Sequence, residues 1–111
     1  MQVYGFSNET EGLTDIDNTL KAMQKFVGER IEKVSFTEEI DLICNEEGKM
    51  LGMLPSVAWF EDNELVDVIC GDCFLCRFDG KGNFTDIKEK DVEVIERKLK
   101  SLIRYRNSIE L

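Results

Sequence analysis

The sequence contains no histidine and only one proline, and each shortage narrows what the protein can be. Histidine is the commonest acid–base group near neutral pH and the commonest metal ligand, so the chain lacks the usual residue for both kinds of chemistry. Pro55 stands alone, and no serine-rich or low-complexity stretch marks a linker within the 111 residues. A chain of this length without a linker is predicted to form one domain, residues 1–111.

Long apolar stretches are also missing. Every uninterrupted apolar run is only a few residues long, far below the roughly 20 residues that a membrane-spanning helix needs. The first residues, MQVYGFSNETEG, lack the basic region and apolar run of a secretory signal. We therefore expect a cytoplasmic protein without a membrane partner, in which the four cysteines are reduced.

Negative charge is in excess and unevenly distributed. The chain carries 23 acidic and 14 basic side chains, which gives a net charge of −9. Residues 1–64 hold 14 of the acidic and 5 of the basic side chains, whereas residues 65–111 hold nine of each. Ionised carboxylates are almost never buried without a partner, so this excess is predicted to lie on the surface. An acidic surface favours a basic protein partner and argues against direct binding to nucleic acid.

The candidate partner-binding residues come mainly from the acidic segments of the first 64 residues. Trp59 and Phe60 directly precede Glu61 and Asp62, an arrangement that suits an aromatic interface residue with an acidic rim. The alternative, that Trp59 lies in the core, stays open. The predicted partner-binding residues are Glu38, Glu39, Asp41, Glu46, Glu47, Trp59, Glu61, Asp62 and Glu64.

Two apolar stripes at helical spacing predict two helices. The first helix is expected over residues 15–27, with Thr14 as its N-cap and Gly28 just after its end. The second helix is expected over residues 89–105. The stripes consist of Ile16, Leu20, Met23 and Val27 in the first helix, and of Val92, Ile95, Leu99, Leu102 and Ile103 in the second.

The segments between the helices are predicted to form strands and turns. Residues 1–6 are expected as a short edge strand, 7–14 as a loop, 30–37 and 40–44 as strands, 49–54 as a strand or extended segment, 55–59 as a short helix or turn, and 65–78 as a strand bent at Gly71-Asp72. Turns are expected at 45–48 and 80–83. Because crossover helices are missing, we predict an α+β fold. Its single, mostly antiparallel sheet of about four strands has the N-terminal and C-terminal helices packed on one face.

The cysteines offer a metal site as one alternative. Cys70, Cys73 and Cys76 lie close together, and Cys44 completes a set of four that suits zinc or an iron–sulfur cluster. In a continuous strand Cys73 faces away from Cys70 and Cys76, so the four thiols meet only if the chain turns at residues 71–72. Buried, reduced cysteine is the favoured interpretation. No histidine is present to activate a thiolate, and no enzyme activity, cofactor or metal is predicted.

Basic residues crowd the end of the second predicted helix. Their position complements the helix dipole, although a nucleic-acid site is an alternative. A further alternative is a nucleotide or small-molecule site in which Arg77, Arg97 or Arg104 holds phosphate; no glycine-rich phosphate-binding motif supports it. The crowded basic residues are Arg97, Lys98, Lys100, Arg104 and Arg106.

Several short motifs resemble a family of small domains of unknown function from phages, plasmids and integrated elements of bacteria. The shared segments are FVG at 26–28, RIEKV at 30–34, NEEGK at 45–49, LP at 54–55 and VICGD at 68–72. Two positions depart from the family pattern: Glu29 replaces a second glycine, and Ser56-Val57 replaces an asparagine after the proline. The family has no established catalytic residues, so the resemblance implies none here.

The resemblance implies a context for the acidic surface. Small acidic proteins of mobile elements often inhibit host defence by occupying cationic grooves that otherwise bind DNA or RNA. The resulting hypothesis is a protein that binds and inhibits a nucleic-acid-handling host enzyme, such as a CRISPR or restriction effector. The sequence leaves the oligomeric state open.

Overall fold

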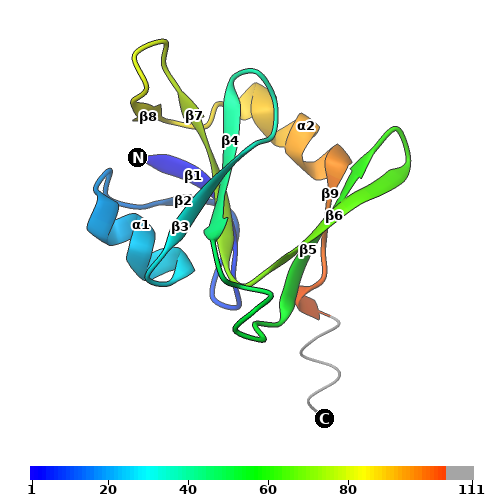
Figure 1. Ribbon diagram of the computed structural model, residues 1–111. Helices are drawn as coiled ribbons and strands as arrows, with labels where there is room; N and C mark the ends of the chain where they lie inside the picture. The colour runs from blue at the N-terminus through cyan, green and yellow to red at the C-terminus, as the bar shows by residue number, and fades with distance from the viewer. Residues whose placement is uncertain (105–111) are drawn as a thin grey trace.

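Two antiparallel sheets and two helices make up the fold in the computed structural model, which describes residues 1–104 (Figure 1). The elements are β1 (Gln2–Phe6), β2 (Glu11–Asp15), α1 (Leu20–Val27), β3 (Ile31–Ser35), β4 (Ile40–Asn45), β5 (Pro55–Glu61), β6 (Glu64–Cys70), β7 (Cys73–Phe78), β8 (Phe84–Thr85), α2 (Glu89–Lys98) and β9 (Leu99–Ser101). Sheet A has the order β2-β1-β7-β4-β3, with β8 paired to β7, and sheet B has the order β6-β5-β9.

The predicted α+β class with mostly antiparallel pairing is confirmed, but the single sheet of about four strands was wrong. The segment predicted as one bent strand, 65–78, divides at Gly71-Asp72 into β6 and β7, which belong to different sheets. Gly71 has φ +90°, a conformation that residues with a side chain rarely adopt. A bend in the sequence is therefore the point where the chain changes sheets.

Strand β5 occupies the segment that was predicted as a short helix or turn. It pairs with β6 and, on its other edge, with β9, which comes much later in the chain. Pro55 is the first residue of the strand, where a missing N–H is tolerated. The pairing with β9 also ends α2 at Lys98 instead of residue 105. Tyr105 and Arg106 lie outside the described residues.

Helix α1 begins later than predicted. Residues 11–15, which include the expected cap Thr14, pair with β1 as strand β2. The cap is Thr19, whose hydroxyl oxygen accepts the N–H of Ala22 at 3.1 Å. Met23 and Val27 lie one turn apart and are both buried, and the helix ends at Gly28 as expected.

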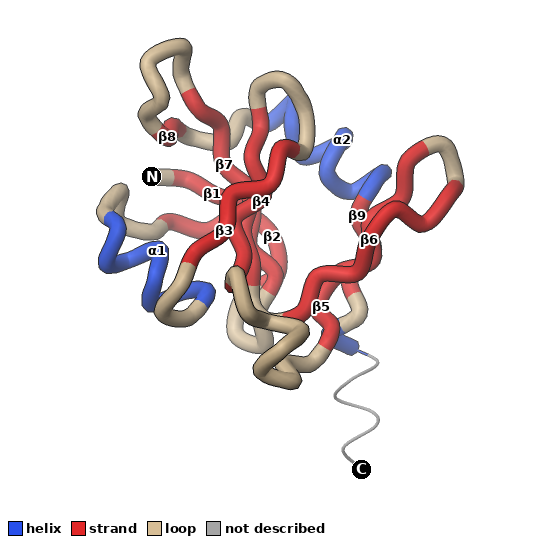
Figure 2. The backbone as a smooth tube through the Cα atoms, in the orientation of Figure 1, coloured by secondary structure: helices blue, strands red, loops and turns tan. Residues whose placement is uncertain are grey.

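The helices lie on opposite faces of sheet A, contrary to the expectation that they share one face (Figure 2). Alternate residues of a strand point to opposite faces, so β7 contributes Phe74 and Cys76 to the smaller core beneath α1. Cys73 and Leu75 belong to the larger core, which sheet A shares with α2 and sheet B. Neither helix within residues 1–104 has the length and apolar content of a membrane span.

Arg77 in β7 joins sheet A to α2. Its Nε and Nη2 donate to the two carboxylate oxygens of Asp91 at 2.6 and 2.7 Å, and its Nη1 donates to Glu39 at 2.6 Å. Asp91 also accepts the backbone N–H of Lys88, just before α2, at 2.9 Å. Burial opposes the ionisation of Asp91, but the hydrogen bonds from Arg77 and Lys88 outweigh it and hold its pKa below the ordinary value.

Replacing Asp91 by alanine should lower the free energy of unfolding by about 3–5 kcal/mol at pH 7, because Arg77 is left largely buried without its bidentate partner. Glu39→Gln, at the exposed end of the same network, should have a much smaller effect. Because the pKa of Asp91 is lowered in the folded state, its contribution is present above the unfolded pKa of about 3.9 and is lost as the pH falls through the lowered folded value. Urea unfolding measures both variants, and equal effects would contradict this account.

Candidate functional site

Apart from Asp41, which lies in β4, the predicted acidic residues lie at three turns that point in different directions (Figure 1). Glu38 and Glu39 lie in the β3–β4 turn, residues 46–47 follow β4, and residues 61–64 form the β5–β6 turn. The fold therefore does not gather the candidate residues into one patch. Each turn has to be assessed by its own neighbours.

Three of the candidate carboxylates are used within the molecule. Glu39 binds Arg77, and Glu61 accepts from Lys98 of α2 at 3.0 Å. Hydrogen bonds from these cations lower the pKa of both carboxyl groups. Glu47 lies 3.5 Å from Arg30. Part of the acidic excess of the first 64 residues is thus neutralised by cations of the same chain.

Two further candidates are buried, contrary to the prediction that they lie on a partner-binding surface. Asp41 is 6% exposed near the start of β4, where burial raises its pKa and the opposing effect of Lys33 is weaker. Trp59 belongs to the larger core, with its ring centroid 5.4 Å from that of Phe36. Its Nε1 donates to Glu61 at 3.0 Å. The alternative that Trp59 is a core residue is confirmed, because odd-numbered positions of β5 face α2 and sheet A.

The remaining four candidates are exposed and make no ion pair within residues 1–104. They are Glu38, Glu46, Asp62 and Glu64. Asp62 and Glu64 lie at the tip of the β5–β6 hairpin, which projects from the rest of the fold (Figure 1). Asp62 and Asn63 both have positive φ, 49° and 66°, which is typical of a two-residue hairpin turn. A tight turn of this kind holds the two carboxylates away from the body of the domain.

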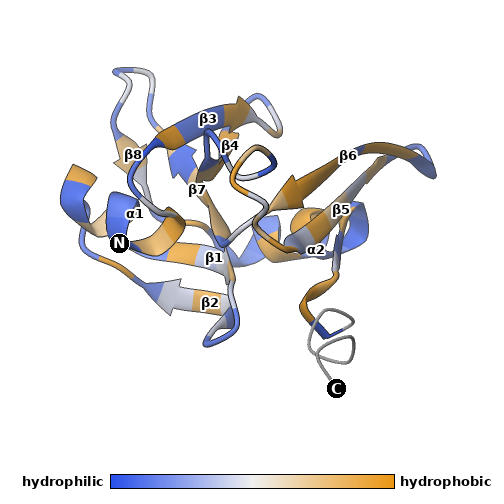
Figure 3. Ribbon diagram, turned by 60° about the horizontal axis from the view of Figure 1, so that its bottom comes forward, coloured by the Kyte–Doolittle hydropathy of each residue, from blue (hydrophilic) through white to orange (hydrophobic). Residues whose placement is uncertain are grey.

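Two exposed apolar side chains beside this tip were not among the residues predicted from the sequence to bind a partner. Leu65 and Val66 in β6 are 57% and 53% exposed, and Figure 3 shows hydrophobic residues along β6 toward the projecting turn. Phe60 is paired with Leu65 across the hairpin, so their side chains share a face. The inward orientation of Trp59 places Phe60 on the outer face of sheet B, which no helix of the described residues covers.

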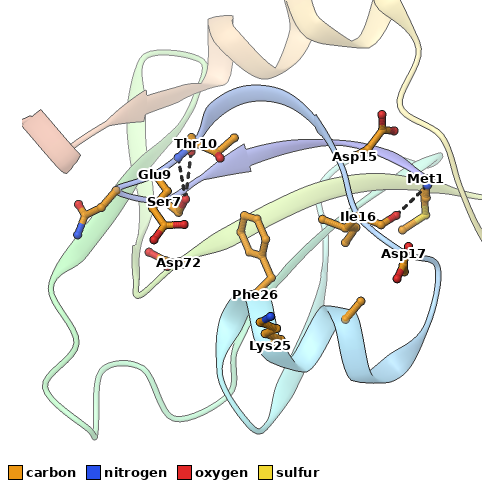
Figure 4. Close-up of a pocket in the computed structure, with 12 residues that line it drawn as sticks. Met1, Ser7, Glu9, Thr10, Asp15, Ile16, Asp17, Lys25, Phe26 and Asp72 are labelled. Carbon is orange, nitrogen blue, oxygen red and sulfur yellow. Dashed lines mark hydrogen bonds between the residues drawn. The ribbon is translucent and has the colours of Figure 1, made fainter.

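A groove of about 750 Å³ lies between α1 and the β1–β2 hairpin (Figure 4). Ile16, Ala22 and Phe26 supply its apolar lining. Figure 4 places Glu9 and Asp72 toward one end and Asp17 toward the other. The residues along it include four acidic ones, Glu9, Asp15, Asp17 and Asp72, together with Lys25, although the Asp15 side chain is directed away from α1.

Small residues in β1 and β2 account for the groove. Phe26 packs on β1 so closely that a Cβ at Gly5 would lie 3.1 Å from its ring. Opposite Gly5, strand β2 has Gly12, where an added Cβ would meet nothing within 4 Å. The helix therefore covers β1 and leaves the neighbouring part of β2 uncovered. Sequence reasoning did not anticipate this groove, because residues 7–14 were interpreted as a loop.

The cysteines do not converge. Cys44 and Cys73 belong to the larger core, Cys76 belongs to the smaller core on the opposite face of sheet A, and Cys70 ends β6 in sheet B. Burial raises the pKa of Cys44 to about 11 and that of Cys76 to about 12. Within residues 1–104, no three Cys, Asp or Glu side chains are arranged to hold a metal ion.

The basic residues considered for phosphate binding are separated in the same way. All three guanidinium nitrogens of Arg77 donate to Asp91 or Glu39, so its side chain is not directed at a ligand. Arg97 and Arg104 are exposed, at different points near the end of the described chain. Neither supplies the enclosed site that a nucleotide needs.

The family model DUF3846, a domain of unknown function, matches residues 1–100. The chain belongs to the DUF3846 family. The match spans both sheets and both helices, so the whole architecture described above is that of a DUF3846 domain. Searches of curated proteins and of solved structures find no match.

A thiol-specific reagent such as DTNB should react quickly with one cysteine of the native domain at pH 8, and with all four after denaturation. Cys70 is the partly exposed thiol, whereas Cys44, Cys73 and Cys76 are buried. The Cys70→Ser variant should remove the fast phase. A fast phase of two or more thiols, or stoichiometric zinc by elemental analysis, would contradict this arrangement.

Asp41→Asn should leave the free energy of unfolding at pH 7 unchanged or raise it, unlike the change at Asp91. The folded pKa of Asp41 is raised, so its ionisation costs stability as the pH rises through the interval between the unfolded and folded values. Removing the charge removes that cost. Urea unfolding at pH 4 and pH 7 measures the difference, and a loss of stability at pH 7 would mean that the carboxylate is stabilised by its surroundings.

Proposed function

We propose that this DUF3846 domain is a non-catalytic protein-binding module whose β5–β6 hairpin contacts a basic partner. The observation that carries the proposal is the combination at the hairpin of two exposed carboxylates, Asp62 and Glu64, with the exposed side chains of Leu65 and Val66. Interfaces commonly pair an apolar centre with a polar rim. Here the rim is negative, which selects a positively charged partner.

The hairpin is also held in a fixed position, which lowers the cost of binding. Glu61, which pairs with Glu64 next to the turn, accepts hydrogen bonds from Trp59 and from Lys98 of α2. The Lys98 ammonium group lies 5.7 Å from the centre of the Phe36 ring, so one strand of the hairpin is connected to the larger core next to the turn. The tip is thereby presented to a partner without having to be ordered first.

The narrower proposal is that the partner is a nucleic-acid-handling defence enzyme of a bacterial host, such as a CRISPR or restriction effector. Such enzymes carry cationic grooves that bind nucleic-acid phosphates, and carboxylates on a rigid domain can occupy these grooves in place of the phosphates. The net charge of −9 supports this choice. So does the resemblance of the motifs at residues 26–34 and 45–49 to domains of mobile elements.

Reversing the charge of the tip with Asp62→Lys and Glu64→Lys should weaken binding to a purified effector by about tenfold or more. Leu65→Asn with Val66→Thr should weaken it to a similar degree, because the apolar centre is lost. Both changes are at exposed positions, so thermal stability should be nearly unchanged. Surface plasmon resonance at increasing salt concentration measures the affinities, and binding by the unchanged domain should fall as salt rises.

Glu29→Lys with Glu32→Lys, two reversals at exposed positions far from the hairpin in the chain, is the matched control: it changes the net charge by the same amount and should retain most of the affinity. In cells, co-expression of the unchanged domain should raise phage plating on a host with the defence system, and co-expression of the charge-reversed tip variant should not. Equal weakening by the control and the tip variants would show that only total charge matters. Binding that is indifferent to salt and to every variant would refute the proposal.

A further inference from the structure

Strand β2 is the terminal strand of sheet A, and its outer edge carries no strand within residues 1–104. The ladder to β1 shows which backbone groups face outward. Ser7 N–H donates to Thr10 C=O, and Ile16 N–H donates to Met1 C=O. Hydrogen-bonded pairs alternate in an antiparallel ladder, so Gly12 and Thr14 bond to β1. The N–H and C=O groups of Glu11, Leu13 and Asp15 therefore point away from the sheet.

The side chains along this edge have a symmetric pattern. Leu13 is 45% exposed and lies between two acidic residues, Glu11 and Asp15, on the same face of the strand. Neither carboxylate makes an ion pair within residues 1–104. Gly12 and Thr14 lie on the opposite face, the one that α1 packs against: a Cβ at Gly5 would lie 3.6 Å from the Thr14 methyl group and 3.1 Å from the Phe26 ring.

A second copy of the chain is a poor occupant of the edge. Antiparallel pairing of two β2 strands about Leu13 sets Glu11 of each copy opposite Asp15 of the other. Like charges directly opposite each other destabilise a strand pair. Opposite charges at the same two positions stabilise it, so the edge is complementary to a strand with basic residues at both ends and an apolar residue between them.

From these observations we infer that β2 binds an extended segment of a partner protein with the pattern basic-x-apolar-x-basic, added as a further strand of sheet A. The basic side chains lie opposite Glu11 and Asp15, and the apolar side chain lies opposite Leu13. The two intervening side chains lie on the α1 side of the sheet, where an added Cβ at Gly12 would meet nothing within 4 Å, so that a large residue fits beside it. Main-chain hydrogen bonds to the edge provide affinity, and the side chains provide selectivity.

The test uses the peptide Ac-Arg-Tyr-Val-Tyr-Arg-NH₂, whose pattern fits the edge in either strand direction, and its counterpart with glutamate in place of both arginines. Titration into the ¹⁵N-labelled domain should shift the amide signals of residues 11–16 with the arginine peptide and not with the glutamate peptide. Shifts confined to residues 38–39 and 61–64, or equal binding of the two peptides, would overturn the inference. Success or failure at the hairpin tip leaves this outcome unaffected, because the two sites are scored by different amide signals.

Leu13→Pro removes one outward N–H without removing a hydrogen bond to β1, since proline is tolerated where the N–H of an edge strand faces solvent. It should lower the affinity for the arginine peptide by about tenfold or more. Leu13→Thr, which keeps the N–H, should lower the affinity less. Full affinity in the proline variant would exclude strand addition.

Glu11→Lys with Asp15→Lys keeps every backbone donor. It therefore tests the charge complementarity of the edge even if the proline variant fails to fold. This double variant should no longer bind the arginine peptide and should bind the glutamate peptide instead. Spermidine serves as a simple cation: equal competition by spermidine would reduce the edge to a general cation site and overturn the inference. Concentration-dependent dimerisation that Leu13→Pro abolishes would assign the edge to a second copy and overturn it as well.

Discussion

The burial of strand β7 on both faces determines the layers of this domain. Residues 73–76 are fully buried, with Phe74 and Cys76 facing α1 and Cys73 and Leu75 facing α2 and sheet B. An antiparallel sheet often leaves one face to solvent, but a strand of this composition cannot. Two covering layers are needed, and 111 residues supply them by placing one helix on each side and adding a second sheet. The turn at Gly71 follows from the same need, because it carries the chain from one layer to the other.

Sequence periodicity located the elements whose stability is local and missed those that depend on distant partners. Turns at 45–48 and 80–83 and the core of both helices were predictable from glycine, capping residues and apolar spacing. Strands β2, β5 and β9 have little periodicity of their own and exist because another strand pairs with them. The stripe Ile95, Leu99 and Ile103 shows the difference: all three residues are in the core as predicted, yet Leu99 lies in a strand instead of a helix.

The candidate site was harder to predict for a related reason. Composition determines how many carboxylates are present, but their availability depends on cations brought from elsewhere. Glu39 is neutralised by Arg77, and Glu61 by Lys98, each from a distant part of the chain. Which face of sheet B a side chain lies on determines whether it is available: Trp59 faces the core, whereas Leu65 faces outward. The sequence alone does not predict these orientations, because they depend on which face of sheet B is covered.

The sign of the charge on the β2 edge distinguishes self-association from binding of the proposed basic segment. Exposed edge strands invite unwanted pairing, and proteins commonly prevent it with charged side chains, lysine above all. Of the four terminal strands, β2 carries only acidic charge, at Glu11 and Asp15. Strands β3 and β9 carry Lys33 and Lys100, and in β6 Asp67 is paired with Lys49. Any charge repels a second copy of the same strand, so protection alone does not require acid. At the β2 edge, negative charge is consistent with the proposed partner, because it attracts a basic segment where lysine would repel one. Protection from self-association and recognition of a cationic partner can thus rest on the same side chains.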